Sequence, residues 1–412
     1  LRQGGLTSGD RVWFPAIFTA GEKAYDVKIR LRGDGTAHWG TAKKSWRIKF
    51  KKNQLYDGYW EINLVIAIER HFETEILAYD LARKKGLLVR DGGTATLKIN
   101  RVDMGDYVWF EQFTAESLER KRLPGGNIIS PDNSWIDFGK QASANKLEFY
   151  RHLSSYRPVF DDIPNKGIVL DRWRNVLDSV KHGSDDEFRR QIPHLIDMKK
   201  FSGWSAIILL FGNSHGMSNL NLSWYYNTAS GLFEPIMYDV DLVPMGSEVD
   251  GQVVLTNSRK FDFADNLIGQ RILRVAEFRN GRDEILFGIL NNEFEEARGR
   301  QLAIYRRLEP YMMRGISAQP PDYVRREFKK RQAALDINRR ALLYLIGRAR
   351  LFAETDLAVG DNQLTLNIDI RPDTLAGIRV REIAASFARQ LDIDAGGVLV
   401  TLSREGGGGA LP

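Results

Sequence analysis

Cysteine is absent from this chain of 412 residues. Disulfide bridges, zinc–thiolate sites and thiol nucleophiles are therefore excluded. Long apolar runs are absent as well: the best of them, residues 206–211, is far shorter than the roughly 20 apolar residues of a transmembrane helix. The chain starts at Leu1 rather than Met. We therefore expect a fragment, from which any signal peptide or anchor can have been removed. The absence of cysteine favours an exported or bacterial cell-envelope location over a cytoplasmic one.

Neither sign of charge dominates the sequence. The chain has 59 Lys and Arg residues against 53 Asp and Glu residues, so its net charge is only +6. The basic residues are spread along the chain, whereas a surface that binds nucleic acid needs them clustered on one face. We therefore expect no nucleic-acid partner. A mildly basic surface suits small anionic ligands such as nucleotides.

The patterns along the chain predict an α+β protein with more than one unit, because 412 residues exceed the usual size of one compact domain. Residues 1–115 contain alternating and aromatic-rich segments and are expected to be strand-rich, with one helix over 72–85. Residues 116–355 have mostly helical spacing, although 125–137 has the composition of a loop. Residues 356–412 alternate and then end in glycines, which predicts a small β-containing appendage that is partly flexible.

Two polar stretches in the second region contain side chains suited to phosphate chemistry. Residues 210–221 have the sequence LFGNSHGMSNLN, and a later apolar strand ends in YDVD at 238–241. Phosphoryl transfer needs a side chain that accepts the hydroxyl proton, together with an Asn and an Asp that hold Mg²⁺ against the phosphates. The two stretches therefore predict a nucleotide phosphotransferase site.

Several segments, taken in their order along the chain, resemble the CotH (spore coat protein H) kinase family. They are VKIRLRG at 27–33, KKSWRIKF at 43–50, Asn63-Leu64, the helix over 77–86, residues 100–112, Leu118-Glu119 and the region 215–241. The resemblance covers residues 25–241, and the order of the segments is more specific than any one of them.

The resemblance implies a two-lobed, atypical protein-kinase-like fold. The N-lobe would be strand-rich, with a glycine loop and one helix, over residues 1–115, and the mainly helical C-lobe would occupy 116–355. The resemblance also implies that the chain uses ATP and a divalent metal, Mg²⁺ or Mn²⁺, to phosphorylate Ser or Thr on a protein. A coat or envelope protein is the expected substrate.

The same resemblance assigns the residues around the metal. Asp239 is similar to the family's metal-binding Asp, Asp241 is a second candidate ligand, and Asn221 is the candidate amide ligand, for which Asn219 competes. His215 stands where the family carries its presumed catalytic Asp. An imidazole can accept a hydroxyl proton near neutral pH, so we expect His215 to be catalytic. The resemblance makes Asp239 the second catalytic residue.

The nucleotide is expected to contact the first region. Gly33 and Gly35 permit the backbone to approach a phosphate closely. Arg32 can grip a phosphate bidentately, or pair with a carboxylate on its own sheet. Glu111 ends a hairpin strand, where it can contact the nucleotide, brace a hinge or form a cross-strand salt bridge.

Three lysines compete for the contact with phosphate: Lys43, Lys44 and Lys49. Kinases place this lysine on a strand near the glycine loop, which favours Lys49, whereas the resemblance favours the other two. Its acidic partner is expected on the following helix, at Glu75 or Glu73.

The histidine at position 215 leaves other functions open. The chain can be a pseudokinase that holds nucleotide, or none, and acts as a scaffold in a cell-envelope or coat assembly. It can also be another nucleotide-dependent transferase on the same fold.

Overall fold

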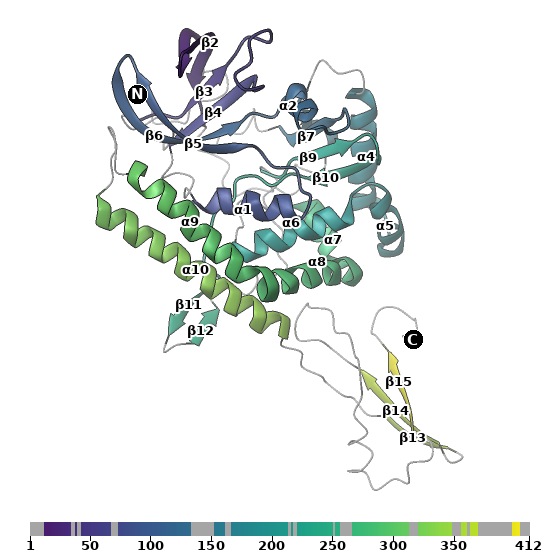
Figure 1. Cartoon of the computed structure of the whole chain (residues 1–412). Helices are drawn as coiled ribbons and strands as arrows, with labels where there is room; N and C mark the ends of the chain where they lie inside the picture. Colours follow the sequence, from purple (N-terminus) through teal and green to yellow (C-terminus); the bar gives the residue numbers. More distant parts are fainter. Residues whose placement is uncertain are drawn as a thin grey trace, which may run out of the picture.

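The computed structural model describes residues 12–33, 38, 43–66, 73–132, 152–160, 166–212, 216, 221–249, 252–255, 266–312, 320–347, 356–360, 363–369 and 398–403. Over these residues the protein is α+β, as the sequence predicts. Figure 1 shows a strand-rich part that lies above a layer of helices, and a second, smaller sheet beside them.

The larger sheet is antiparallel throughout and has the strand order β1-β2-β3-β4-β6-β5. Its strands are β1 (Phe14–Ala20), β2 (Lys23–Leu31), β3 (Trp46–Lys49), β4 (Glu61–Ile66), β5 (Gly92–Ile99) and β6 (Val102–Glu111). All six residues of β4 are buried. Strand β4 was not predicted from the sequence, although Glu61 and Asn63 alternate with Ile62 and Leu64 at its start.

The two faces of this sheet differ in chemistry because side chains alternate along each strand. One face carries an apolar cluster that consists of Tyr25, Val27, Ile48, Phe50, Ile62, Leu64, Ile66 and Tyr107. Arg47 and Lys49 alternate with Ile48 and Phe50, so they belong to the other face. Arg30 is paired with Arg47 in the register of β2 and β3, which places it on the same face. We call this second face the polar face of the sheet.

Helix α1 (Glu73–Lys84) confirms the single helix expected in the first region. It ends before Gly86, whose positive φ of 71° is typical of a residue that follows a helix C-terminus. Its buried residues Leu77, Ala78 and Leu81 join the largest apolar cluster of the molecule, together with β6 and the helices that follow. In Figure 1, α1 lies between the larger sheet and the helical layer.

The helical layer is built around one very apolar helix, α6. Its helices are α4 (Lys166–His182), α5 (Asp185–Gln191), α6 (Met198–Leu210), α7 (Leu267–Arg274), α8 (Ala276–Gly288), α9 (Phe294–Met312) and α10 (Pro321–Gly347); a shorter helix, α2 (Ala115–Arg120), precedes them. Every residue of α6 from 201 to 210 is buried, because neighbouring elements surround it. Helix α10 starts at Pro321, where proline is favoured because the missing N–H has no intrahelical partner there.

A second sheet has the order β10-β9-β7-β8. Its strands are β7 (Asn127–Pro131), β8 (Tyr156–Pro158), β9 (Trp224–Asn227) and β10 (Leu232–Pro235). Strand β7 lies inside the segment 125–137 that composition predicts to be a loop, so that prediction is wrong for these residues. Its strand partners are remote in the sequence, and local composition does not show remote partners.

The remaining strands are outside both sheets. They form a hairpin of β11 (Gly246–Val249) and β12 (Gln252–Leu255) and a sheet of β13 (Asp356–Gly360), β14 (Gln363–Asp369) and β15 (Val398–Ser403). Strands β13 to β15 agree with the β-containing appendage predicted for residues 356–412. The limits of the three predicted units remain predictions.

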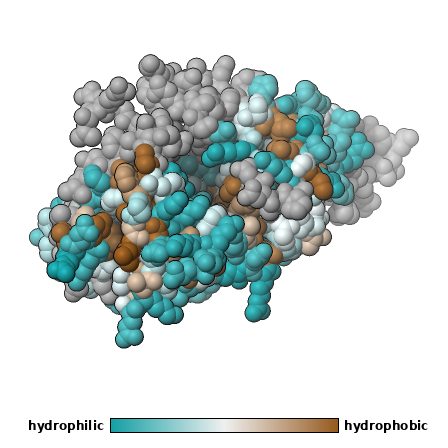
Figure 2. All heavy atoms as spheres, turned by 90° about the horizontal axis from the view of Figure 1, so that it is seen from above, coloured by the Kyte–Doolittle hydropathy of each residue, from teal (hydrophilic) through white to brown (hydrophobic). Residues whose placement is uncertain are grey.

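Two properties of the surface bear on function. Among the described residues, no helix is long and apolar enough to cross a membrane. Figure 2 shows hydrophilic residues over much of the face seen from above, with hydrophobic residues in small groups between them.

Candidate functional site

The polar face of the larger sheet meets the segment that follows β10. Arg32, just after β2, is buried, and its guanidinium donates a hydrogen bond of 3.4 Å to the hydroxyl of Tyr238. The guanidinium of Arg90 lies over the ring of Tyr238, 4.2 Å from its centroid. Tyr238 directly precedes Asp239. Two regions that are 206 positions apart in the sequence therefore meet next to the predicted metal-binding residue.

Four arginines gather at this junction. The centre of the group is Arg47, whose guanidinium donates hydrogen bonds to the side-chain oxygens of Asn63 at 2.9 Å and of Gln112 at 3.0 Å. The pKa of Arg47 is lowered to about 9, mainly by burial and then by the charge of Arg32; Glu61 opposes these effects, and Arg30 and Arg90 add to them. We call Arg30, Arg32, Arg47 and Arg90 the arginine cluster. Four guanidinium groups in one place suit a polyanion such as a nucleotide phosphate chain.

Asp239 has an unusual backbone conformation. Its φ is +58°, in the left-handed region, and its side chain is buried. Four other non-glycine residues of the described chain have positive φ, and all four are exposed. Such a conformation costs about 1–3 kcal/mol and persists where the surroundings impose it, often at functional sites.

Two further candidate metal ligands are Asp241 and Asn221. Asp241 is half-buried in the same segment as Asp239. Strands β9 and β10 pair Trp224 with Pro235, and the Ile236 amide donates a hydrogen bond to the Ser223 carbonyl. Asn221 lies two residues before Ser223 and Asp239 lies three residues after Ile236, so both candidates are in segments that adjoin this strand pair.

These residues fit a divalent metal bound together with phosphates. The described residues contain no group of three or more His, Asp or Glu side chains that could hold a metal ion alone. Mg²⁺, however, is usually held by one or two carboxylates while phosphates and water complete its shell. Asp239 and Asp241 supply two carboxylates, and Asn221 supplies an amide oxygen.

A buried asparagine holds the two site-bearing segments together. Asn338 of α10 donates hydrogen bonds of 3.0 Å to the carbonyls of Leu210 and Val243 and accepts one of 2.7 Å from the Met245 amide. Leu210 ends α6, directly before the stretch that contains His215. Asn338 therefore ties the start of that stretch to the segment that follows Asp241.

Gly212 permits the close contact between these two segments. Its φ is +58°, and a Cβ atom on it would lie 2.0 Å from the carbonyl oxygen of Val243. The amide of Val243 also donates a hydrogen bond of 2.9 Å to the carbonyl of Phe211. His215, Asn219 and Gly35 lie outside the described residues.

The three candidate lysines have different surroundings. The ammonium of Lys43 donates a hydrogen bond to the carbonyl of Asp106 and lies 4.6 Å from the centroid of the Tyr107 ring. Burial lowers the pKa of Lys43, although Asp106 and Asp103 raise it. The structure therefore places Lys43 against β6.

Lys49 lies on the polar face, next to Arg47 in the pattern of alternation. Its ammonium forms an ion pair of 3.0 Å with Glu61 and lies 4.1 Å from the centroid of the Trp60 ring. Lys44 is half-buried. Of the three lysines, Lys49 is the one that the strand alternation places on the face of the arginine cluster.

Gly33, the candidate glycine of the loop, lies directly against the ring of His38. Gly33 has a φ of +94°, and a Cβ atom there would lie 2.2 Å from the His38 ring. His38 in turn makes a 3.2 Å hydrogen bond with the Ser45 hydroxyl. Position 33 therefore requires glycine, both for its left-handed backbone and for the close approach of the His38 ring.

The candidate carboxylates divide into two groups. Glu75 is buried on α1 and accepts a 2.6 Å hydrogen bond from the hydroxyl of Tyr79. Glu73 forms a bidentate ion pair with Arg331 of α10, at 2.5 and 3.1 Å. Because Arg331 holds Glu73, Glu75 is the stronger candidate for the acidic residue of the site.

Glu111 belongs to a separate network. It forms ion pairs with Arg120 and, at 2.6 Å, with Lys121, and it accepts a 2.8 Å hydrogen bond from the amide of Asp91. In β6 it is paired with Ile62, a residue of the apolar face. The structure does not bring Glu111 to the arginine cluster.

Three members of the arginine cluster were missed as site residues by sequence reasoning: Arg30, Arg47 and Arg90. The signal for the first two is present in the strand alternation, because Arg30 and Arg32 are two positions apart, as are Arg47 and Lys49. Arg90 follows no strand pattern, and only the tertiary structure brings it over Tyr238.

Comparison with known protein families identifies the family of this chain. The family model described as CotH kinase protein matches residues 29–330, which is most of the chain. The match extends from β2 into α10 and includes the arginine cluster, α1, α6 and Asp239. The comparison with curated proteins gave no match.

Proposed function

Because the chain belongs to the CotH kinase protein family, we propose that it is an ATP-dependent protein kinase that phosphorylates Ser or Thr with Mg²⁺ or Mn²⁺. The observation that supports the proposal is the hydrogen bond from Arg32 to Tyr238, the residue directly before Asp239. Protein kinases need a cationic phosphate site from one part of the chain and a metal-binding Asp from another. The larger sheet with α1 then corresponds to an N-lobe, and the helical layer to a C-lobe.

Different side chains have different roles in the proposed phosphoryl transfer. Arg32 and Arg47 hold the phosphate chain of ATP and offset its negative charge. Asp239, with Asp241 and Asn221, would hold the divalent metal, which neutralises charge on the phosphates when it is bound. Glu75 is the proposed acidic partner of the phosphate-binding cations, and Tyr79 orients its carboxylate.

The reaction requires one proton transfer from the substrate. The hydroxyl oxygen of the substrate forms a bond to the γ-phosphorus, the bond from that phosphorus to the bridging oxygen breaks, and ADP leaves. We assign the hydroxyl proton to the imidazole of His215. A coat or envelope protein is the proposed substrate.

One feature favours a second function. His215 stands where the family carries its presumed catalytic Asp, and such a replacement is compatible with a pseudokinase that binds nucleotide without transferring phosphate. Such a protein would serve as a scaffold.

Thermal unfolding with ATP and Mg²⁺ tests the proposed site. We expect Mg²⁺ and ATP to raise the melting temperature of the wild-type protein, and Asp239→Asn to abolish the part of the shift that depends on Mg²⁺. Asn tolerates a left-handed backbone well, so the variant is expected to fold. The matched control is Asp57→Asn, the same change at an exposed residue with φ of 47°.

Phosphate transfer separates the two functions. With ATP labelled at the γ-phosphate, a kinase transfers label to Ser or Thr of a protein, and His215→Ala lowers the rate. A nucleotide-dependent thermal shift without any transfer would identify the scaffold. The absence of a shift in the wild type would contradict the kinase and the nucleotide-binding pseudokinase, and it would favour a scaffold that holds no nucleotide.

A further inference from the structure

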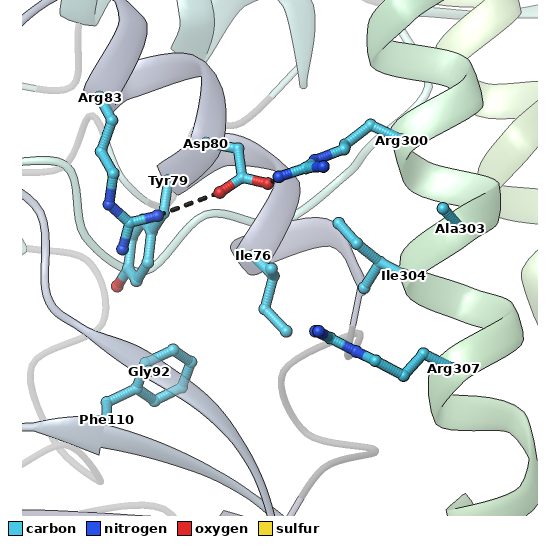
Figure 3. A pocket seen from close by; sticks show the side chains of 10 residues that line it. All are labelled: Ile76, Tyr79, Asp80, Arg83, Gly92, Phe110, Arg300, Ala303, Ile304 and Arg307. Atoms are coloured by element: carbon cyan, nitrogen blue, oxygen red, sulfur yellow. Dashed lines mark hydrogen bonds and ion pairs between the residues drawn. The ribbon is translucent and has the colours of Figure 1, made fainter.

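A second cationic site lies between α1, α9 and the edge of the larger sheet. There a cavity of about 380 Å³ is lined by Ile76, Tyr79, Asp80, Arg83, Gly92, Phe110, Arg300, Ala303, Ile304 and Arg307. Figure 3 shows these residues, with α1 on one side of the cavity and α9 on the other. The volume is within the range of small-ligand sites, and none of these residues belongs to the arginine cluster.

The lining has an apolar part and a charged part. The apolar part comes from Ile76 and Tyr79 of α1, Phe110 of β6 and Ile304 of α9. Gly92 leaves room for Phe110, because a Cβ atom on Gly92 would lie 2.5 Å from that ring. A ligand that fits this cavity therefore has an apolar group as well as a charge.

The charged part has an excess of positive charge. One carboxylate, Asp80, accepts hydrogen bonds of 3.0 Å from both Arg83 and Arg300. Arg307 forms no hydrogen bond or ion pair in the described part of the chain, although it lines the same cavity. Arg83 also forms an ion pair of 3.9 Å with Asp91 and donates a hydrogen bond of 3.1 Å to the Arg90 carbonyl. The charge that remains for a ligand is therefore mainly that of Arg307, with Arg300 beside it, and a phosphate group suits such a pair of guanidinium groups.

We propose that this cavity is a binding site for a phosphate monoester carried on an apolar group. The phosphate is held by Arg307 and Arg300, and the apolar group packs on Ile76 and Phe110. A phosphorylated peptide with a neighbouring apolar residue and a small aromatic phosphate share this chemistry.

The site has a direct connection to α1. Tyr79 lines the cavity, and its hydroxyl donates the 2.6 Å hydrogen bond to Glu75. A ligand that packs against the Tyr79 ring therefore restrains the residue that orients Glu75. This connection rests on the proposed function, in which Glu75 belongs to the ATP site. The binding site in the cavity does not depend on that function.

Calorimetric titration with phenyl phosphate, without ATP or metal, tests the binding site. We expect binding that is at least tenfold tighter than that of inorganic phosphate, since only the ester has an apolar group. Arg307→Gln should weaken it about tenfold, and Ala303→Trp should abolish it by filling the cavity. The matched control is Arg306→Gln, which removes the charge of the neighbouring exposed arginine that is not in the lining.

The outcomes separate the sources of the ligand. Binding of a phosphoserine peptide with a neighbouring leucine, at least as tight as that of phenyl phosphate, indicates a phosphorylated protein, and weaker binding indicates a small molecule. The binding site is overturned if phenyl phosphate does not bind, or if Arg306→Gln weakens binding as much as Arg307→Gln does.

The connection to α1 has its own measurement. We expect saturating phenyl phosphate to change the affinity for ATP at least threefold in the wild type, and to leave it unchanged in Tyr79→Phe, which keeps the ring but lacks the hydroxyl. Equal ATP affinity with and without phenyl phosphate would overturn the connection to Glu75. Absence of ATP binding would refute the proposed function and leave the calorimetric result intact.

Discussion

Arg331 of α10 holds the carboxylate of Glu73 at the start of α1 in a bidentate ion pair, and the Glu73 side chain is fully buried. The two residues are 258 positions apart. The pair fixes α1, which carries Glu75, against the long C-terminal helix of the helical layer. Arg331 lies in a basic run of α10 whose other members mostly face solvent.

Breaking this pair should destabilise the protein strongly. We expect Arg331→Met to lower the free energy of unfolding by about 3–5 kcal/mol, because it leaves a buried carboxylate without its partner. Urea unfolding measures the change. The control is Arg326→Met, because Arg326 is exposed and its contact with Glu327 is 3.7 Å long; it should cost less than about 1 kcal/mol. Equal effects of the two variants would contradict a structural role for the buried pair.

Gly212 should be the glycine of the site that tolerates substitution least. Gly212→Ala forces a Cβ atom against the Val243 carbonyl and strains a left-handed backbone, so we expect a loss of about 2–4 kcal/mol. Gly231→Ala isolates the backbone effect, since Gly231 has a φ of +72° with open space around it. It should cost about 1–2 kcal/mol. Thermal unfolding distinguishes the two; a smaller loss at position 212 than at 231 would refute the close contact.

Asn338 should be essential for the position of the site-bearing segments. Asn338→Leu removes three hydrogen bonds and buries the carbonyls of Leu210 and Val243 without partners, which we expect to cost about 3 kcal/mol. Asn291→Leu serves as control, because Asn291 is exposed and bonds only to a carbonyl of its own helix. Hydrogen exchange of the Met245 amide should accelerate in Asn338→Leu. Unchanged exchange there would show that other contacts hold the segment.

Arg47→Gln should weaken the binding of Mg²⁺-ATP about tenfold or more, since it removes a charged hydrogen-bond donor from the arginine cluster. The matched control is Lys51→Gln, which removes an exposed cation of the same sheet region that pairs with Asp26. Calorimetric titration measures both affinities. Equal affinity of Arg47→Gln and the wild type would place the phosphates elsewhere.

The pH dependence of stability around Arg47 follows from its lowered pKa of about 9. The folded state binds this proton less tightly than the unfolded state. Below pH 9 the buried charge therefore lowers the free energy of unfolding by its full amount. This effect decreases as the pH rises from about 9 toward the ordinary pKa of an arginine side chain. At neutral pH the guanidinium is charged. Over pH 9–10, the unfolding free energy of the wild type should therefore rise relative to that of Arg47→Gln, as chemical denaturation can show; a fall would contradict the shift.

Local patterns in the sequence were sufficient for much of the fold. Helical spacing bounded by Gly86 predicts α1 to within one residue at each end, and the apolar run before Gly212 predicts α6, because these signals come from neighbouring residues. The apolar strand expected before YDVD appears as β10, although it ends at Pro235. Strands β4 and β7 were not predicted, and the pairing partners that define β7 are remote in the sequence.

The sequence by itself determined which chemical groups are available: no thiol, two carboxylates in YDVD, and arginines and lysines that alternate on β2 and β3. Their order along the chain also determined the resemblance that the family match confirms. Only the tertiary structure decided how these groups are used, because pairing across long sequence distances depends on packing. It joined Arg32 to Tyr238, assigned Glu73 to Arg331 and Glu111 to Arg120, and formed the cavity between α1 and α9.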